Sequence, residues 1–70
     1  MNPHDAAVAA IRAFNALEAA TRRADTVCRA VDRGERSLDD FQAAIRARRE
    51  ASTLYRTTRN ALTRVLSGKS

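Results

Sequence analysis

The sequence has 70 residues, of which 44% are apolar and 30% are charged, and it carries a net charge of +5 at pH 7. A chain of this length forms one small domain at most and buries only about 60% of the surface that its unfolded form exposes. Its single cysteine excludes an internal disulfide, and no cluster of cysteine and histidine indicates a metal site. We therefore expect the missing stabilisation to come from another protein chain.

No segment approaches the run of roughly 18 apolar residues that a membrane span requires. The N-terminal sequence MNPHDAAVAA has neither the positive start nor the long apolar stretch of a signal peptide. These features predict a cytoplasmic protein, with export by a route that needs no cleavable signal peptide as the alternative.

A first helix is predicted over about residues 3–33. Asn2 suits the N-cap, Pro3 the first helical position, and Asp5 the positive end of the helix dipole. Residues spaced alternately by four and three predict one stripe facing a partner helix, as in a coiled coil. The predicted stripe is Ala10, Phe14, Leu17, Thr21, Ala24, Cys28 and Val31. On the exposed side, the pairs Glu18/Arg22 and Asp25/Arg29 have the spacing of ion pairs.

A turn is predicted over residues 34–37, followed by a second helix over about 38–66 and a polar tail over 67–70. Gly34 suits a helix stop with left-handed backbone, and Ser37 suits the N-cap of the second helix. Because the connection is short, the helices should fold back on each other. The fold class is therefore all-α: a single antiparallel two-helix hairpin, coiled-coil-like, completed by self-association or by a partner.

The second helix has one broad apolar face. Its members are Phe41, Ala44, Ala51, Leu54, Tyr55, Thr58, Ala61, Leu62, Val65 and Leu66. Together with the first stripe, this face predicts a core of Phe14, Leu17, Cys28, Val31, Phe41, Leu54, Leu62 and Val65. If Leu17 and Leu54 are fully buried, replacing either with alanine should cost about 2–5 kcal/mol.

The arginines of the segment RARREASTLYRTTR, residues 46–59, lie mainly off this face. At about 100° per residue, Arg46, Arg49, Arg56 and Arg64 point away from it. Arg48 and Arg59 lie at its border, where their aliphatic stems can cover apolar surface. The segment is therefore interpreted first as the solvated back of a helix.

The sequence lacks the residues of an active site. His4 is the only histidine and lies in the first helical turn, so no catalytic triad can form around it. Cys28 is expected to be buried in the stripe rather than reactive. Asp39 and Asp40 fit capping of the second helix, and no glycine-rich phosphate loop is present. We expect no enzyme, no cofactor, no metal and no small-molecule substrate.

A hairpin needs one apolar stripe on each helix, and several apolar residues lie outside these two stripes. Val8 and Ile11, with Phe14 at the edge, lie beside the first stripe, and Tyr55 with Leu66 forms a second such edge. These residues either widen the contact within the hairpin or bind a further protein, which would be a second copy or another helical protein. Nucleic acid is the alternative partner, bound through Arg46, Arg49, Arg56 and Arg64. A role as a membrane-surface helix is the weakest, because alanine dilutes the apolar faces.

The second helix also resembles a known family. Leu38-Asp39-Asp40-Phe41-Gln42-Ala43-Ala44-Ile45 is similar to the start of the second helix in the needle subunits of bacterial type III secretion systems. The blocks Thr53-Leu54-Tyr55-Arg56 and Arg64-Val65-Leu66 are similar to two further blocks of that family. In this chain the blocks are several residues further apart than in the needle subunits. The turn also carries Gly34, where the needle subunits usually have proline.

The resemblance covers roughly 30 residues and implies a helical hairpin that polymerises, or one of the small helical chaperones that keep such subunits soluble. In either case, it implies that Leu54, Tyr55, Val65 and Leu66 contact another subunit. The predicted partner-binding residues are then Val8, Ile11, Phe14, Leu54, Tyr55, Val65 and Leu66.

Overall fold

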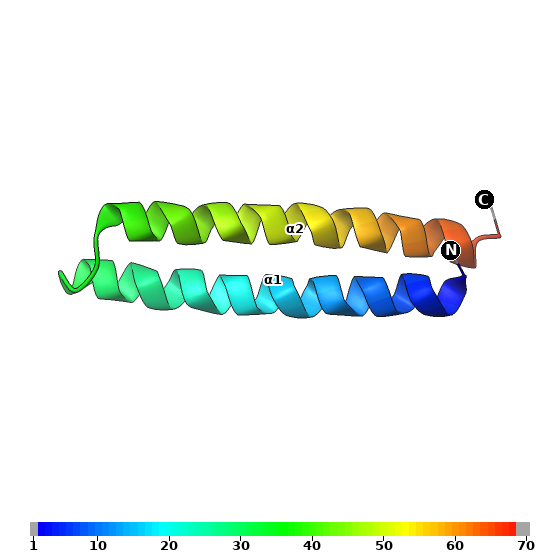
Figure 1. The fold of residues 1–70 in the computed structure, drawn as a ribbon, viewed down its shortest axis with the longest axis horizontal. Coiled ribbons are helices and arrows are strands. Elements are labelled where there is room, and N and C mark those ends of the chain that lie inside the picture. Colours follow the sequence, from blue (N-terminus) through cyan, green and yellow to red (C-terminus); the bar gives the residue numbers. More distant parts are fainter. Residues whose placement is uncertain (1, 69–70) are drawn as a thin grey trace.

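The protein is an antiparallel hairpin of two long helices (Figure 1). The computed structural model describes residues 2–68, in which α1 spans Pro3–Asp32 and α2 spans Leu38–Leu66. The expected all-α hairpin is confirmed, and the helix bounds agree with the predicted ranges to within one residue. Lys69 and Ser70, which end the expected polar tail, lie outside the described residues. The Cα trace measures 52 × 14 × 13 Å, so the molecule is a single pair of helices with no second layer.

Both helices begin at the predicted caps. The Asn2 side chain accepts a hydrogen bond from the Asp5 backbone N–H at 2.8 Å, and the Ser37 hydroxyl accepts one from the Asp40 N–H at 3.2 Å. Each bond satisfies a backbone donor that has no partner within its own helix. Short polar side chains therefore determine where each helix starts.

Gly34 ends α1 as predicted. Its φ is +78°, and its N–H donates to the Val31 carbonyl at 2.9 Å, while the Glu35 N–H donates to the Ala30 carbonyl at 2.8 Å. This pair of bonds is a Schellman motif, which requires a left-handed residue at the position of Gly34. A Cβ there would meet no atom within 4 Å, so glycine is favoured for its backbone conformation and not for space.

The helices meet along small residues. Within residues 2–68, the buried positions are Ala6, Ala10, Ala13, Ala24, Val27, Ala30 and Ala44. Val27 packs with Ala24 and Ala44, and half-buried Val31, Phe41 and Ile45 flank this cluster. Alanine allows two helix backbones to approach closely, so the contact between the helices is narrow and contains little apolar area.

The predicted stripe of α1 consists of two sets of residues, each with a seven-residue spacing. The structure confirms one set and contradicts the other. Ala10 and Ala24 are buried, and Leu17 and Val31 are half-buried, as predicted. Phe14, Thr21 and Cys28 are exposed, and their places in the contact are taken by Ala13, half-buried Ala20 and Val27. The physical reason is a rotation of α1: Phe14 is too large to lie between backbones that approach closely at Ala13 and Ala24, so its side of the helix turns outward. Thr21 and Cys28 lie 7 and 14 residues further along the same side and turn outward with it.

The predicted core needs a matching correction. Leu17, Val31, Phe41, Leu62 and Val65 are half-buried between the helices, whereas Phe14, Cys28 and Leu54 are exposed.

Polar groups along the helices find local partners. The hydroxyl of half-buried Thr58 donates to the carbonyls of Leu54 and Tyr55, both at 3.0 Å, which explains how a threonine is tolerated between the helices. The predicted Asp25/Arg29 ion pair is present at 3.0 Å. Glu18 and Arg22 do not form one among the ion pairs of the described residues. Neither helix, over residues 2–68, is long and apolar enough to cross a membrane.

Candidate protein interaction surface

Five large apolar side chains among the described residues are exposed. The exposed fraction is 60% for Ile11, 44% for Phe14, 61% for Leu38, 54% for Leu54 and 68% for Leu66. Scattered exposed leucines are common on proteins, so their arrangement decides whether they form a site.

One group of them lines an apolar hollow near the open end of the hairpin. The hollow has a volume of about 390 Å³ and lies between Ile11 and Phe14 of α1 and Tyr55 and Leu62 of α2. The rings of Phe14 and Tyr55 have centroids 5.5 Å apart and are tilted by 56°, which is a favourable arrangement for two aromatic rings. The Arg59 guanidinium lies 5.7 Å from the centre of the Tyr55 ring, so it covers part of this hollow from α2.

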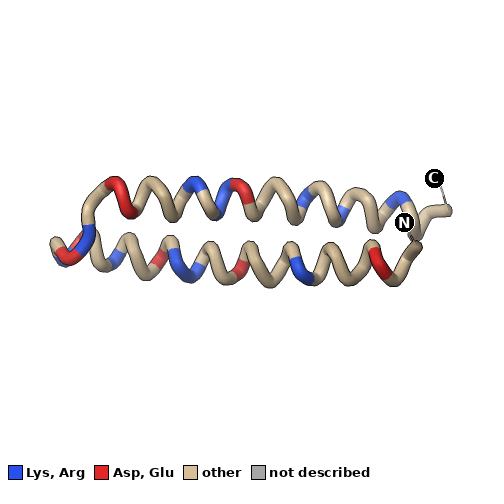
Figure 2. Tube along the Cα trace, in the orientation of Figure 1, with Lys and Arg blue, Asp and Glu red and all other residues tan. Residues whose placement is uncertain are grey.

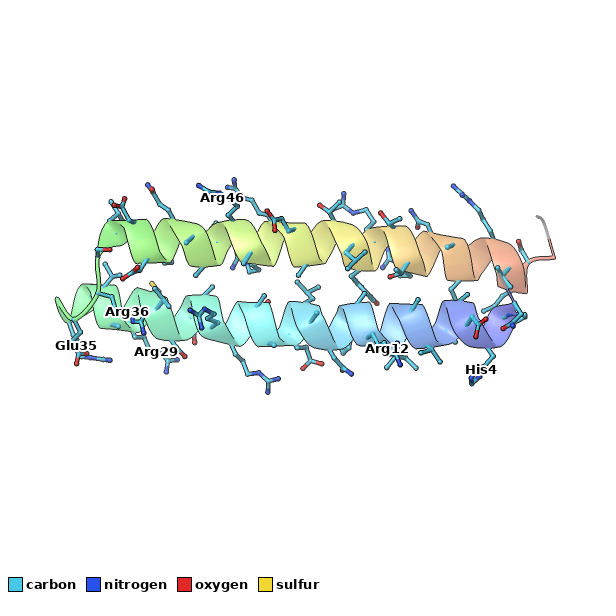
Figure 3. All side chains as sticks on the ribbon, viewed as in Figure 1. His4, Arg12, Arg29, Glu35, Arg36 and Arg46 are labelled. Carbon is cyan, nitrogen blue, oxygen red and sulfur yellow. The ribbon has the colours of Figure 1, made fainter. Side chains whose placement is uncertain are left out.

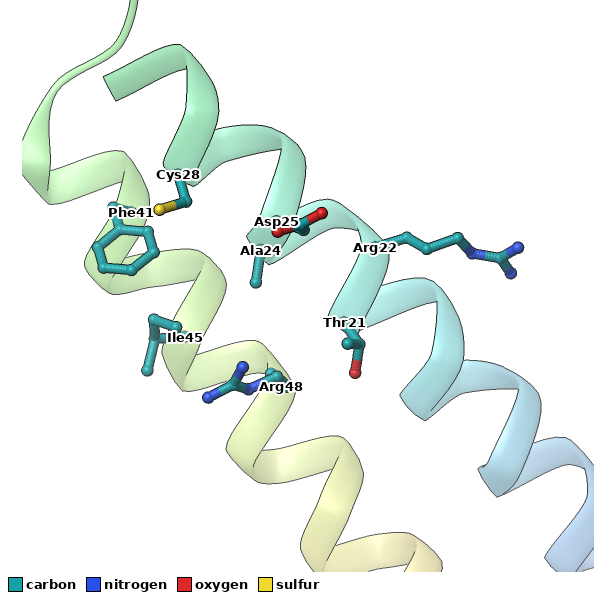
Figure 4. A pocket seen from close by; sticks show the side chains of 8 residues that line it. All are labelled: Thr21, Arg22, Ala24, Asp25, Cys28, Phe41, Ile45 and Arg48. Carbon is teal, nitrogen blue, oxygen red and sulfur yellow. The ribbon is translucent and has the colours of Figure 1, made fainter. Parts of the chain in front are cut away.

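A second hollow, of about 300 Å³, lies nearer the turn (Figure 4). Cys28 of α1 and Phe41 and Ile45 of α2 supply its apolar wall, and the Cys28 thiol turns toward the Phe41 ring (Figure 4). Thr21 and Arg48 border the hollow on the side away from the turn. Cys28 was expected between the helices, but it lies on this outer surface.

Both hollows lie on the same side of the hairpin. Ala7, Phe14, Thr21 and Cys28 are seven residues apart, and so are Phe41, Arg48, Tyr55 and Leu62. In two helices that pack side by side, a seven-residue spacing follows the contact along its length. Each hollow is bounded by two members of each line. We call this side the aromatic face; the apolar residues that line its hollows include Ile11, Phe14, Cys28, Phe41, Ile45, Tyr55 and Leu62. The seven-residue spacing from Ile45 and Arg59 adds Leu38 and Leu66.

The structure brings together some of the predicted partner-binding residues and separates others. Ile11, Phe14 and Tyr55 line one hollow. Leu66 is exposed and lies seven residues after Arg59, which the spacing along α2 assigns to the same side. Val65 is half-buried beside α1. Val8 is half-buried, but it lines neither hollow. Leu54 borders a different hollow, on the back of α2 with Thr53 and Thr57.

Sequence reasoning missed the half of the aromatic face nearer the turn. Cys28 and Phe41 were assigned to the core, and Ile45 was not assigned a role. The two seven-residue lines are visible in the sequence and would have placed these residues beside Phe14 and Tyr55, had the alanines been recognised as the contact between the helices.

The exposure of Leu54 gives a direct test of this arrangement. We expect Leu54→Ala to change the free energy of unfolding by less than about 1 kcal/mol, because the side chain is mostly in water already. Urea denaturation followed by circular dichroism measures this change. A loss of 2 kcal/mol or more, about what a buried leucine contributes, would place Leu54 back between the helices.

Charge is distributed unequally over the two helices (Figure 2). α1 carries four arginines and four acidic residues, whereas α2 carries six arginines and three acidic residues. The predicted back-facing arginines Arg46, Arg49, Arg56 and Arg64 are all exposed. Figure 3 shows Arg46 pointing away from α1, and Arg12 and Arg29 pointing away from α2. The charged side chains therefore lie mainly around the aromatic face, although Arg22, Asp25 and Arg48 line the hollow nearer the turn and Arg59 lines the other hollow.

No group of three or more histidine, cysteine, aspartate or glutamate side chains within residues 2–68 is placed to hold a metal ion. His4 is exposed at the start of α1 (Figure 3). Comparisons of the chain with models of protein families, with characterised proteins and with solved structures find no match.

Proposed function

We propose that this chain is a small helical subunit that works by protein–protein contact and has no catalytic activity. One observation carries the proposal: within residues 2–68 the buried core consists of alanine and one valine, whereas Phe14, Ile11 and three leucines are exposed. Burying a side chain of that size typically contributes about 1.5–3 kcal/mol, so covering the aromatic face with another helical protein would add stability that the hairpin alone lacks.

Photo-crosslinking in the cells that produce the protein tests this proposal. A photoreactive amino acid at Phe14, on the aromatic face, should yield adducts of the chain with protein. The same group at Asn15, an exposed neighbour on the same helix, should yield far fewer. Equal yields from the two positions, or the absence of protein adducts from both, would contradict the proposed role.

A more specific form of the proposal is a component of a bacterial secretion apparatus, or a chaperone of one. It rests on the resemblance of Leu38–Ile45 and of the two later blocks to needle subunits. The exposure of Leu54 and Leu66, which that resemblance implies as subunit contacts, supports it. Electron microscopy separates the two forms, since a needle subunit grows into filaments and a chaperone stays in discrete particles.

The excess of arginine on α2 favours nucleic acid as a second candidate partner. Arg46, Arg49 and Arg56 are exposed, and arginine pairs well with phosphate. A binder of this kind would lose affinity steeply between low and moderate salt, and further on replacing these three arginines by alanine. Binding that changes little in either experiment would exclude it.

A further inference from the structure

We propose that the aromatic face binds a second copy of this chain, so that two hairpins stack into a four-helix bundle with both turns at the same end. In this dimer, α1 of each copy lies over α2 of the other. The inference rests on the proposed function and adds to it the identity of the partner and the orientation of the complex.

The surface area of the hairpin supports a partner of this size. The hairpin exposes 5388 Å², whereas a compact monomer of 7.7 kDa exposes about 4,300 Å². The excess of about 1,000 Å² exceeds the roughly 800 Å² that each partner buries in a standard interface. A compact bundle of two copies would expose about 7,200 Å². Pairing would therefore remove at most about 3,600 Å² from water in total, the limit for a bundle as compact as a globular monomer, and this limit lies in the range of obligate homodimers.

Polar residues fix how two such faces match along their length. Thr21 and Arg48 line the hollow nearer the turn on its side away from the turn. Half-buried Ser52, seven residues after Ile45, lies beyond them along α2, and we call these three residues the polar belt. When both turns lie at the same end, each hollow meets its own equivalent and belt meets belt. Thr21 lies about one turn beyond the middle of α1. A copy in the reverse direction would therefore set its belt against the Phe14–Tyr55 pair, leaving Arg48 buried among apolar groups.

The charged flanks of the face favour the same orientation. Beside the face, α1 carries Glu18 and Asp25, seven residues apart, of which Asp25 is paired with Arg29 at 3.0 Å, so Glu18 is the acidic group left to meet a partner. α2 carries Arg49 and Arg56, also seven apart. Phe14 contacts Tyr55 and Ala24 packs with Ala44, so Glu18 lies level with the segment between Arg49 and Arg56. With both turns at one end, the acidic flank of each copy meets the basic flank of the other. In the reverse orientation, like charges meet on both flanks, which is unfavourable.

Sedimentation velocity over a concentration series tests the dimer. The wild-type protein should form a discrete particle of twice the chain mass. Phe14→Glu should raise the dissociation constant at least about tenfold, because it sets a charge in the centre of the interface. Asn15→Glu is the matched control and should leave the constant nearly unchanged. Circular dichroism on the same samples shows whether each variant is still helical.

The orientation is tested by the distance between labels at the turn. With Arg36→Cys and Cys28→Ala combined, two spin labels in a dimer should lie within about 30 Å of each other, since packed helices are about 10 Å apart. In the reverse orientation they would be separated by about the 52 Å length of the hairpin. Glu18→Arg should weaken the dimer, and adding Arg49→Glu should restore it.

A helical monomer at every concentration, or labels about 50 Å apart, would overturn the inference. Either result leaves the proposed function standing if photo-crosslinking at position 14 yields adducts with a different protein. An absence of protein adducts from that position would overturn the proposed function itself.

Discussion

Replacing Val27 by aspartate is expected to unfold the hairpin. Val27 is 4% exposed and packs against Ala24 and Ala44 in a buried cluster that joins the two helices. A carboxylate there would face Ala24 and Ala44 and would have to ionise in an apolar setting or stay protonated, at a cost of several kcal/mol. That cost is comparable with the whole stability of a domain of this size.

Thr26→Asp is the matched control, because the neighbouring residue is exposed and the two substitutions place the same charge at almost the same height in α1. Threonine, valine and aspartate have similar helix propensities, so propensity does not separate the variants. Far-ultraviolet circular dichroism during urea denaturation should show loss of helix for Val27→Asp only. Equal stability of the two variants would show that Val27 is not buried.

The second large effect is expected for Ala44→Leu. Ala44 is 5% exposed and lies against α1, so three additional carbon atoms have to push the helices apart or adopt a strained rotamer. Overpacking of this kind costs about 1–3 kcal/mol, although leucine is the more hydrophobic residue. Ala43→Leu makes the same replacement at an exposed neighbouring position, so its change in helix propensity is the same. It should leave the melting temperature nearly unchanged. An increase in stability for Ala44→Leu would mean that the helices are not held together by alanine contacts.

The fold follows from local signals that the sequence carries openly. Asn2 and Ser37 form the caps, Gly34 provides the left-handed stop, and the uninterrupted stretches between them form the helices. Each of these features depends on a few neighbouring residues, so no knowledge of the tertiary contact is needed to predict them. The antiparallel arrangement then follows from the short connection.

The contact between the helices was harder to predict because size and hydrophobicity point in different directions. Ranking by hydrophobicity assigns Phe14 and Leu54 to the core, and that assignment is wrong for both. Close packing along Ala13, Ala24 and Ala44 turns the contact toward the alanines and leaves the large residues outside. A rotation of this kind depends on the fit between the two helices, which a pattern of apolar residues on one helix does not contain.

Only part of the candidate site was predicted, because the same rotation of the contact was missed. Ile11, Phe14 and Tyr55 were identified as residues beyond the needs of a hairpin, and the structure places them around one hollow. Cys28 and Phe41 were assigned to the core, so the second hollow and the continuity of the aromatic face were missed. Partner and orientation depend on how two surfaces match, and here they are inferred from the polar belt and the charged flanks.

The reactivity of Cys28 tests the central claim most directly, because this thiol is the only one in the chain and lies on the aromatic face. The measurement is the rate of labelling by a maleimide as the protein concentration is raised. If a second copy covers the face, labelling should slow at least about tenfold as the dimer forms, and Phe14→Glu should restore the fast rate. A labelling rate that is fast and identical at every concentration would contradict the claim, because the aromatic face would then remain open to water.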